Sequence, residues 1–261
     1  MIDPRILDMA SRQPYPLLFL TISGAHLYGF PSPDSDWDLR GAHLLPLRSV
    51  VGLDYARETI ETSSIAEGLD VDLVTHDLRK FMRLMLKRNG YVLEQLYSPL
   101  VVHSTAAHEE LKEIGKGCIT RKHSGHYLGF AKTQWGLFAK GEPKRIKPLL
   151  YTYRVLLTGI HLMRTGEIEA SIIRLLDAYP APQVSELVVR KREGAEDAVL
   201  DHHDLSLHER EIQRLTAALE DAYAQSSLPS EPRGRAALED MLIRLRMAAG
   251  PAQRVPGEAP A

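Results

Sequence analysis

The chain has little of several features that define whole classes of protein. It contains one cysteine, Cys118, among 261 residues, so no internal disulfide can form and no Cys-x-x-Cys metal motif exists. No stretch of about 18 consecutive apolar residues is present, which predicts no membrane span. The first residues lack the basic and then apolar segments of an export signal. These absences predict a protein of the reducing cytoplasm without a membrane partner.

A large charge of one sign is missing too. Lys and Arg number 32 and Asp and Glu number 34, a formal net charge of −2. This balance argues against a generally basic nucleic-acid coat and leaves room for a local basic groove. The contents of 44% hydrophobic and 25% charged residues are those of globular proteins. The length allows one large domain or two modest ones.

Two patterns of hydrophobicity divide the chain. Short apolar segments separated by turns predict strands at about 17–22, 37–45, 59–63 and 69–75. From residue 105 onward the pattern is almost entirely helical. We therefore predict an α+β fold, with a small mixed β-sheet domain over residues 1–103 and an all-helical domain over 104–249. The Pro/Gly/Ala-rich residues 250–261 predict a disordered tail.

Asp36 and Asp38 carry the first chemical signal. On a strand they point to one face, with Cα atoms about 6.6 Å apart. Two carboxylates so placed repel each other, and a divalent cation is their natural partner. The simpler interpretation is turn chemistry followed by a solvated strand edge, because Pro-Asp-Ser-Asp is also typical of turns.

A second pair, Asp70 and Asp72, repeats this spacing on a later predicted strand. If the two strands are neighbours, a third carboxylate completes an oxygen site suited to Mg²⁺, and two ions about 3.5–4 Å apart could clamp an in-line phosphoryl displacement. The turn at Gly24 and Ala25, directly after a buried strand, offers backbone N–H groups and room for phosphates.

The order of these features resembles that of a known superfamily. Residues 23–41 read SGAHLYGFPSPDSDWDLRG, and a second Asp-bearing strand follows. This resembles the DNA polymerase β-type nucleotidyltransferase superfamily, and the longer pattern is similar to its branch associated with RNA repair. The resemblance extends over about residues 17–165. It implies a polymerase-β-like nucleotidyltransferase domain in the first half and a helical domain that closes the nucleotide cleft.

The resemblance implies roles for single residues. Asp36 and Asp38 would hold two Mg²⁺ (or Mn²⁺) ions, and Asp72 would be the third carboxylate, which takes the proton from the attacking hydroxyl. Asp70 is the alternative, because a strand shift of two residues would exchange it with Asp72. Gly24 would seat the triphosphate of an NTP such as ATP.

One departure from the superfamily lies in this turn. Ala25 stands where the superfamily has a serine, so a hydroxyl contact to the β- and γ-phosphates is missing. Ser23 lies one residue before the glycine and is expected to point elsewhere. Replacing Ala25 by serine is therefore expected to tighten NTP binding.

Further candidates lie on a predicted helix and around the carboxylates. Lys147, Tyr151 and Arg154 share one helical face and could grip a triphosphate and stack a base, as the resemblance also implies. A plain solvated face is the alternative. We expect Arg40 to brace the carboxylates rather than contact substrate, and His26 to pack within its loop, with nucleotide contact as the alternative.

The prediction for function is a metal-dependent nucleotidyltransferase that moves an NMP from an NTP to a hydroxyl acceptor and releases pyrophosphate. The resemblance points to an RNA 3′ end as acceptor, with a small-molecule or protein acceptor as an alternative. Another alternative is a catalytically weak nucleotide- or RNA-binding partner protein, for which Ala25 is the main argument. The sequence alone leaves the oligomeric state open.

Overall fold

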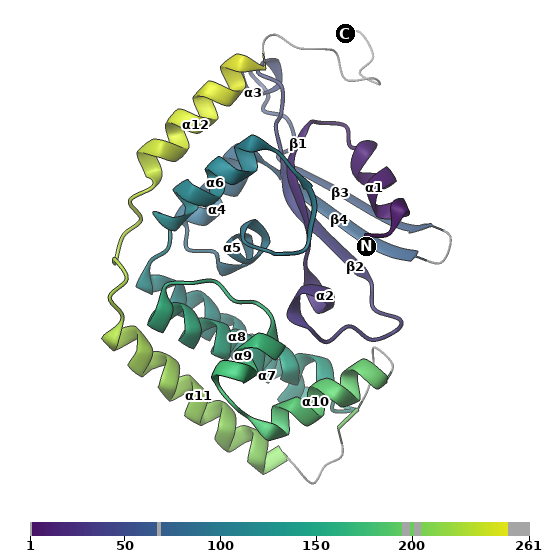
Figure 1. Cartoon of the computed structure of the whole chain (residues 1–261), viewed down its shortest axis with the longest axis vertical. Helices are drawn as coiled ribbons and strands as arrows, with labels where there is room; N and C mark the ends of the chain where they lie inside the picture. The colour runs from purple at the N-terminus through teal and green to yellow at the C-terminus, as the bar shows by residue number, and fades with distance from the viewer. Residues whose placement is uncertain (1, 67–68, 195–198, 201–204, 250–261) are drawn as a thin grey trace.

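In the computed structural model of the chain, which describes residues 2–66, 69–194, 199–200 and 205–249, five strands form one mixed sheet (Figure 1). The strand order is β3-β4-β2-β1-β5. The strands are β1 (Leu17–Ile22), β2 (Trp37–His43), β3 (Thr59–Ala66), β4 (Leu69–Asp77) and β5 (Val101–Ser104). β2 and β4 are parallel, whereas the other neighbours are antiparallel. The predicted α+β class with a mixed sheet is confirmed; the tail predicted at 250–261 lies outside the described residues.

Helices cover both faces of the sheet. Successive side chains of a strand point to opposite faces, and β1 follows this rule: Leu20 lies in the apolar cluster that contains Ile6 of α1 (Pro4–Ser11), whereas Phe19 packs edge-on against Phe81 of α4. The helices on the second face are α4 (Leu78–Leu86), α5 (Gly90–Leu96) and α6 (Ala106–Lys116). Asp77 caps α4 by accepting a hydrogen bond from the backbone N–H of Arg79.

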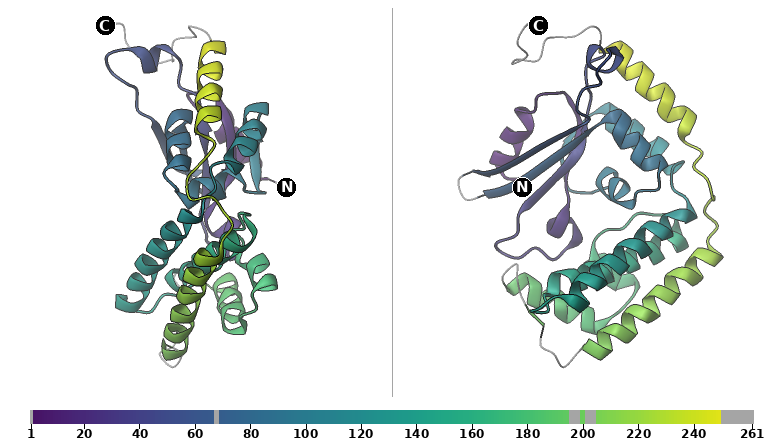
Figure 2. Two further views of the ribbon diagram at one scale, coloured as in Figure 1. Left: turned by 90° about the vertical axis from the view of Figure 1, so that its left-hand side faces the viewer. Right: turned by 180° about the vertical axis from the view of Figure 1, so that it is seen from behind.

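A second group of helices comes from the second half of the chain. It lies next to the sheet rather than on one of its faces, below it in the views of Figures 1 and 2. The long helix α8 lies at its centre, because it is apolar on nearly all sides and packs against α7, α9, α10 and α11. The bounds are α7 (Ser124–Lys140), α8 (Ile146–Thr165), α9 (Ile172–Ala178), α10 (Pro182–Glu193) and α11 (Leu205–Gln225). The short helix α2 (Gly24–Tyr28) lies where the sheet meets these helices, and Tyr28 packs edge-on against Tyr151 of α8.

The end of the chain returns to the sheet. After α11 the chain runs along the outside of the molecule to α12 (Arg235–Ala248), which packs against α4 and α6 (Figures 1 and 2). Arg246 of α12 is nearly buried and donates to Asp77 at 2.7 Å, at the junction of β4 and α4. The segment 104–249 thus contributes two helices, α6 and α12, to the part of the molecule built on the sheet. A further short helix, α3 (Arg48–Val51), follows β2.

Candidate active site

Asp38 and Asp72 lie directly beside each other on the parallel strands β2 and β4, since the register pairs Asp38 with Asp72 and Trp37 with Val71. Asp70 lies two residues before Asp72 on β4. It is exposed and pairs with Ile65 of the neighbouring strand β3. Of the two residues that the sequence left as alternatives, the register therefore favours Asp72 as the neighbour of Asp38.

Arg40 joins the two carboxylates. One guanidinium nitrogen, Nη2, donates to Asp38 Oδ1 at 2.6 Å and to Asp72 Oδ2 at 2.8 Å, and Nη1 donates to the backbone carbonyl of Asp72 at 2.6 Å. Arg40 thus braces the carboxylates, as its place in the sequence predicted. Ser63 of β3, which the sequence analysis did not single out, donates to Asp72 Oδ1 at 3.3 Å.

Gly24, the first residue of α2, contacts the Asp38 carboxylate. A Cβ atom on Gly24 would stand 1.8 Å from Asp38 Oδ2, and the glycine has φ +59°, which disfavours any side chain. The backbone N–H of Ser23 donates to the Asp38 carbonyl at 2.7 Å and so links the end of β1 to β2. Only glycine fits here, because the Asp38 carboxylate fills the position that a Cβ atom would take.

The electrostatics of Asp38 reflect its crowded position. Burial raises its pKa above the ordinary value, and the nearby carboxylates of Asp36 and Asp72 act in the same direction. Arg40 and Lys147, at the start of α8, act in the opposite direction. The structure therefore brings Asp36, Asp38, Asp72 and Lys147 into one electrostatic neighbourhood.

The donor set suits a hard cation in part. Asp36 and Asp38 supply carboxylate oxygens, the ligands that Mg²⁺ prefers, and Asp38 Oδ2 lies against the backbone of Gly24. However, within the described residues no group of three or more His, Cys, Asp or Glu side chains is arranged to hold a metal ion. At this site the Arg40 guanidinium is bonded to both Asp38 and Asp72. Asp36 and Asp38 are therefore the candidate pair for a divalent cation, while Asp72 is engaged by an arginine.

Two turn residues have their side chains away from solvent. Ala25 is 3% exposed and belongs to the larger apolar cluster of the molecule. Ser23 is 4% exposed and its side chain makes no capping bond to α2. The serine that the superfamily has at position 25 would therefore be buried here, in contrast to the phosphate contact expected from the sequence.

Arg154 lies in the core rather than on an open face. Its guanidinium is fully buried, donates to Glu94 Oε2 at 2.9 Å, and stacks 3.7 Å above the ring of Tyr28. Burial acts to lower its pKa, but Glu94 and the nearby tyrosines raise it above the ordinary value, so the side chain stays charged. Our interpretation of Arg154 as a phosphate ligand does not agree with this position, because the residue has no exposed surface and its charge is already paired.

Tyr151 lies one turn after Lys147 on α8 and packs edge-on against both Tyr28 and Phe30, with ring centroids 5.5 and 5.6 Å apart. It is half-buried. The three residues that the sequence grouped on this helix therefore have different surroundings. The charge of Lys147 acts to lower the pKa of Asp38. Tyr151 packs on α2, and Arg154 supports α2 from within the core.

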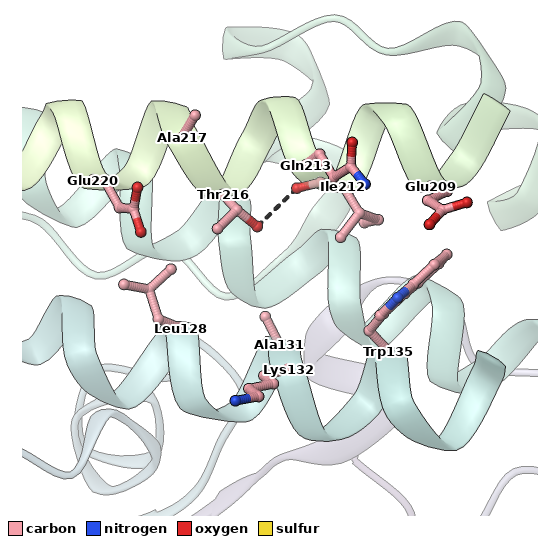
Figure 3. A pocket seen from close by; sticks show the side chains of 10 residues that line it. All are labelled: Leu128, Ala131, Lys132, Trp135, Glu209, Ile212, Gln213, Thr216, Ala217 and Glu220. Carbon is pink, nitrogen blue, oxygen red and sulfur yellow. Dashed lines mark hydrogen bonds between the residues drawn. The ribbon is translucent and has the colours of Figure 1, made fainter. Parts of the chain in front are cut away.

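A separate hollow lies between α7 and α11 (Figure 3), with a volume of about 490 Å³. Leu128, Ala131 and Trp135 line it from α7 and Ile212 lines it from α11. Asp36, Asp38 and Asp72 do not line this hollow. We therefore identify the candidate site from the carboxylates on the sheet and not from this cavity.

Residues 2–244 match the RlaP family, described as "RNA repair pathway DNA polymerase beta family". The chain belongs to this family. The resemblance predicted from residues 17–165 is confirmed over nearly the whole chain, and family and fold together indicate a nucleotidyltransferase.

Relatives of this RlaP-family chain are known by sequence. Uncharacterized protein MJ0002 of Methanocaldococcus jannaschii is 34% identical over 218 residues, 82% of this chain and 88% of that protein. Uncharacterized protein YcgL of Bacillus subtilis is 28% identical over 236 residues, 85% of this chain and 89% of that protein. A crystal structure of a nucleotidyltransferase-like protein from Exiguobacterium sibiricum aligns with 14% identity and a TM-score of 0.32, over 85% of this chain and 73% of that one, too low a score to support an argument. None of the helices in the described ranges is long and apolar enough to cross a membrane.

Proposed function

We propose that the protein is a metal-dependent nucleotidyltransferase that moves a nucleoside monophosphate from an NTP to a hydroxyl acceptor, with an RNA 3′ end as the acceptor. One observation carries the proposal: Asp38 and Asp72 lie in register on parallel strands, and the backbone of Gly24, at the turn after β1, contacts Asp38 Oδ2. This arrangement places a carboxylate pair directly beside the glycine turn that would seat the triphosphate.

In the proposed site, Asp36 and Asp38 hold the divalent cation, Mg²⁺ or Mn²⁺, and a second ion would require Asp72 as a further ligand. When bound, such ions polarise the α-phosphate and stabilise the leaving pyrophosphate. Lys147 contributes positive charge beside Asp38, where the triphosphate would add negative charge. Arg40 holds the two neighbouring carboxylates in a fixed orientation before substrate arrives.

The proposed reaction is a single in-line displacement. The acceptor hydroxyl oxygen forms a bond to the α-phosphorus, and the bond from that phosphorus to the oxygen bridging to the β-phosphate breaks. Pyrophosphate leaves, and the hydroxyl proton passes to Asp72. Oδ1 is the better placed oxygen to take this proton, because Oδ2 accepts from Arg40 Nη2 at 2.8 Å whereas Oδ1 accepts the longer bond from Ser63, at 3.3 Å.

The acceptor is proposed from the family description, which names an RNA repair pathway. The exposed residues Arg83 of α4 and Lys87, directly after α4, are four residues apart and add positive charge on the sheet part of the molecule, as phosphate-backbone contacts require. Two other basic residues of this segment are paired within the protein, because Arg79 binds Glu58 and Arg88 binds Glu231. Small-molecule and protein acceptors are the alternatives.

A second function is favoured by one specific observation. Arg40 occupies the position between Asp38 and Asp72, and a protein that only binds nucleotide or RNA could keep it there permanently. Such a catalytically weak partner protein would bind NTP without turnover.

The test is incubation of the full chain with each of the four labelled NTPs, Mg²⁺ or Mn²⁺, and RNA with a free 3′ hydroxyl, followed by pyrophosphate assay and mass analysis of the RNA. RNA with a 3′ phosphate is the matched control acceptor. The proposal expects pyrophosphate release and an RNA heavier by one or more nucleotides only with the hydroxyl end. Binding without pyrophosphate release would support the partner protein, and pyrophosphate release with unchanged RNA would redirect the search to small-molecule or protein acceptors.

A further inference from the structure

The loop between α2 and β2, which carries Asp36, is held by a buried lysine from the helical half. Lys191 of α10 is fully buried, and its Nζ donates to Ser32 Oγ at 2.7 Å although 159 residues separate the two. A lysine is seldom buried completely, because desolvation of its ammonium group is costly. The hydrogen bond to Ser32 therefore indicates a specific role for this lysine.

From Ser32 the contacts continue toward Asp36. The Ser32 and Ser35 hydroxyl oxygens are 2.9 Å apart, the backbone N–H of Ser32 donates to Ser35 Oγ at 3.0 Å, and that of Ser35 donates to the Ser32 carbonyl at 3.1 Å. This closed turn ends at the residue immediately before Asp36. A movement of Ser32 would therefore pass directly to the backbone of Asp36.

The other side of Asp36 is fixed by an aromatic stack. The ring of His26 lies on that of Trp37, with ring centroids 3.9 Å apart and the planes 18° from parallel. Asp36 thus lies between a hydrogen-bonded turn anchored on α10 and a ring stack anchored on α2. Both anchors lie outside the strand that holds Asp38.

We propose that Lys191 is a positioning residue that sets Asp36 beside Asp38 by fixing the Ser32–Ser35 turn. This inference rests on the proposed function, in which Asp36 and Asp38 are the cation ligands. It makes the helical half of the chain part of the metal site, although it supplies no cation ligand. Groups that orient a ligand in this way typically change metal affinity about 10- to 100-fold when removed.

The test uses the full chain carrying Lys191→Met, which keeps a long side chain of similar volume and removes the amine. The chain has two tryptophans, and Trp135 lines the hollow between α7 and α11 (Figure 3), so Trp135→Phe leaves Trp37 as the fluorescence reporter. The first measurement is amide hydrogen exchange of residues 29–37 without any cation. The second is Mn²⁺ titration followed by quenching of Trp37.

The expected results are faster exchange over residues 29–37 and about tenfold weaker Mn²⁺ binding, with an unchanged or higher melting temperature. Arg192→Met, an exposed neighbour on the same helix, is the control and should alter neither measurement. Ser32→Ala should reproduce the effect of Lys191→Met, and the double variant should add nothing further. Ser32→Ala also decides the matter if Lys191→Met does not fold.

Unchanged exchange in both variants, additive effects in the double variant, or faster exchange with unchanged Mn²⁺ affinity would each overturn the proposal. If the unaltered chain binds no Mn²⁺, the proposed function fails at this site. In that case the positioning of the turn by Lys191 is still decided by the exchange measurement.

Discussion

Gly24 and Asp38 are in such close contact that a Cβ on the glycine would stand 1.8 Å from the carboxylate oxygen Oδ2. The contact joins the end of β1 and the start of α2 to the strand that carries the candidate metal ligands. A residue with a side chain at position 24 would have to displace the carboxylate. The contact therefore couples the fold of the turn directly to the geometry of the site.

Gly24→Ala is expected to reduce nucleotidyl transfer at least about 100-fold, because misplacement of a reacting group by about 1 Å has an effect of this size. The positive φ adds a strain of about 1–2 kcal/mol. Transfer rates and urea unfolding measure the two effects. Gly129→Ala is the matched control, since nothing lies within 4 Å of the Cβ it would add on α7; there we expect unchanged transfer and equal or greater stability. Full activity in Gly24→Ala would contradict the close contact.

Asp38→Asn is expected to raise the free energy of unfolding at neutral pH in the absence of divalent cations. Burial raises the pKa of Asp38 above the ordinary 3.8, so the folded state takes up a proton more readily than the unfolded state. The destabilising effect of ionisation is therefore absent at low pH and grows as the pH rises through the folded pKa. Asparagine removes it.

Urea unfolding of both proteins with EDTA, from about pH 4 to about pH 8, checks the sign. The advantage of Asp38→Asn should widen as the pH rises and then become constant. Asp177→Asn, at an exposed position on α9, provides the comparison for loss of a carboxylate away from the site. An advantage that shrinks with rising pH would show that the Asp38 carboxylate is stabilised in the fold.

Glu94→Gln is expected to destabilise the protein by about 3–5 kcal/mol, because it leaves the buried Arg154 guanidinium without its counter-charge. Replacing both residues, by Glu94→Leu and Arg154→Met, should recover much of that loss. Urea unfolding measures both variants. Glu113→Gln, which removes an ion pair with Lys116 whose glutamate is 70% exposed, should change stability by less than about 1 kcal/mol. Equal effects of Glu94→Gln and Glu113→Gln would rule out a structural role for the buried pair.

Ala25→Ser is expected to lower stability by about 1–3 kcal/mol, since it places a hydroxyl in the apolar cluster. For the same reason it should not tighten binding of ATP, contrary to what the sequence alone suggested. Calorimetric titration with ATP and Mg²⁺, with a thermal melt of each protein, measures both effects. Affinity that rises tenfold with unchanged stability would mean that the serine reaches the phosphates.

Most of the fold followed from local pattern. The apolar residues that alternate along β4 are a local signal, and the strand predicted at 69–75 is confirmed as Leu69–Asp77. Three short elements, α2, α3 and β5, were missed. The five-residue helix α2 is too short to show a helical period, and its end is set by Gly29 in a left-handed conformation at φ +89°. The edge strand β5 forms through pairing with β1, which no local pattern reveals.

The candidate site was predictable in composition but not in register or burial. The spacing of Asp36 and Asp38, and the glycine after the preceding strand, could be found in the sequence. However, β2 begins at Trp37, so Asp36 lies in the loop before the strand that carries Asp38. The choice between Asp70 and Asp72 depends on how β4 pairs with β2, a tertiary property. The position of Arg154 depends on Glu94, 60 residues earlier, so the analysis of a single helical face could not separate an open side from a buried ion pair.

The most direct test of the proposed site compares Asp72→Asn with Asp70→Asn. Both changes remove one charge from the same face of β4, but only Asp72 lies in register with Asp38 and accepts from Arg40. With labelled NTP, Mg²⁺ and the acceptor found in the screen, we predict a loss of transfer of at least about 1000-fold in Asp72→Asn, and a rate within a few-fold of the unaltered chain in Asp70→Asn. Equal losses in the two variants, or a larger loss in Asp70→Asn, would contradict the assignment of Asp38 and Asp72 as the transfer site.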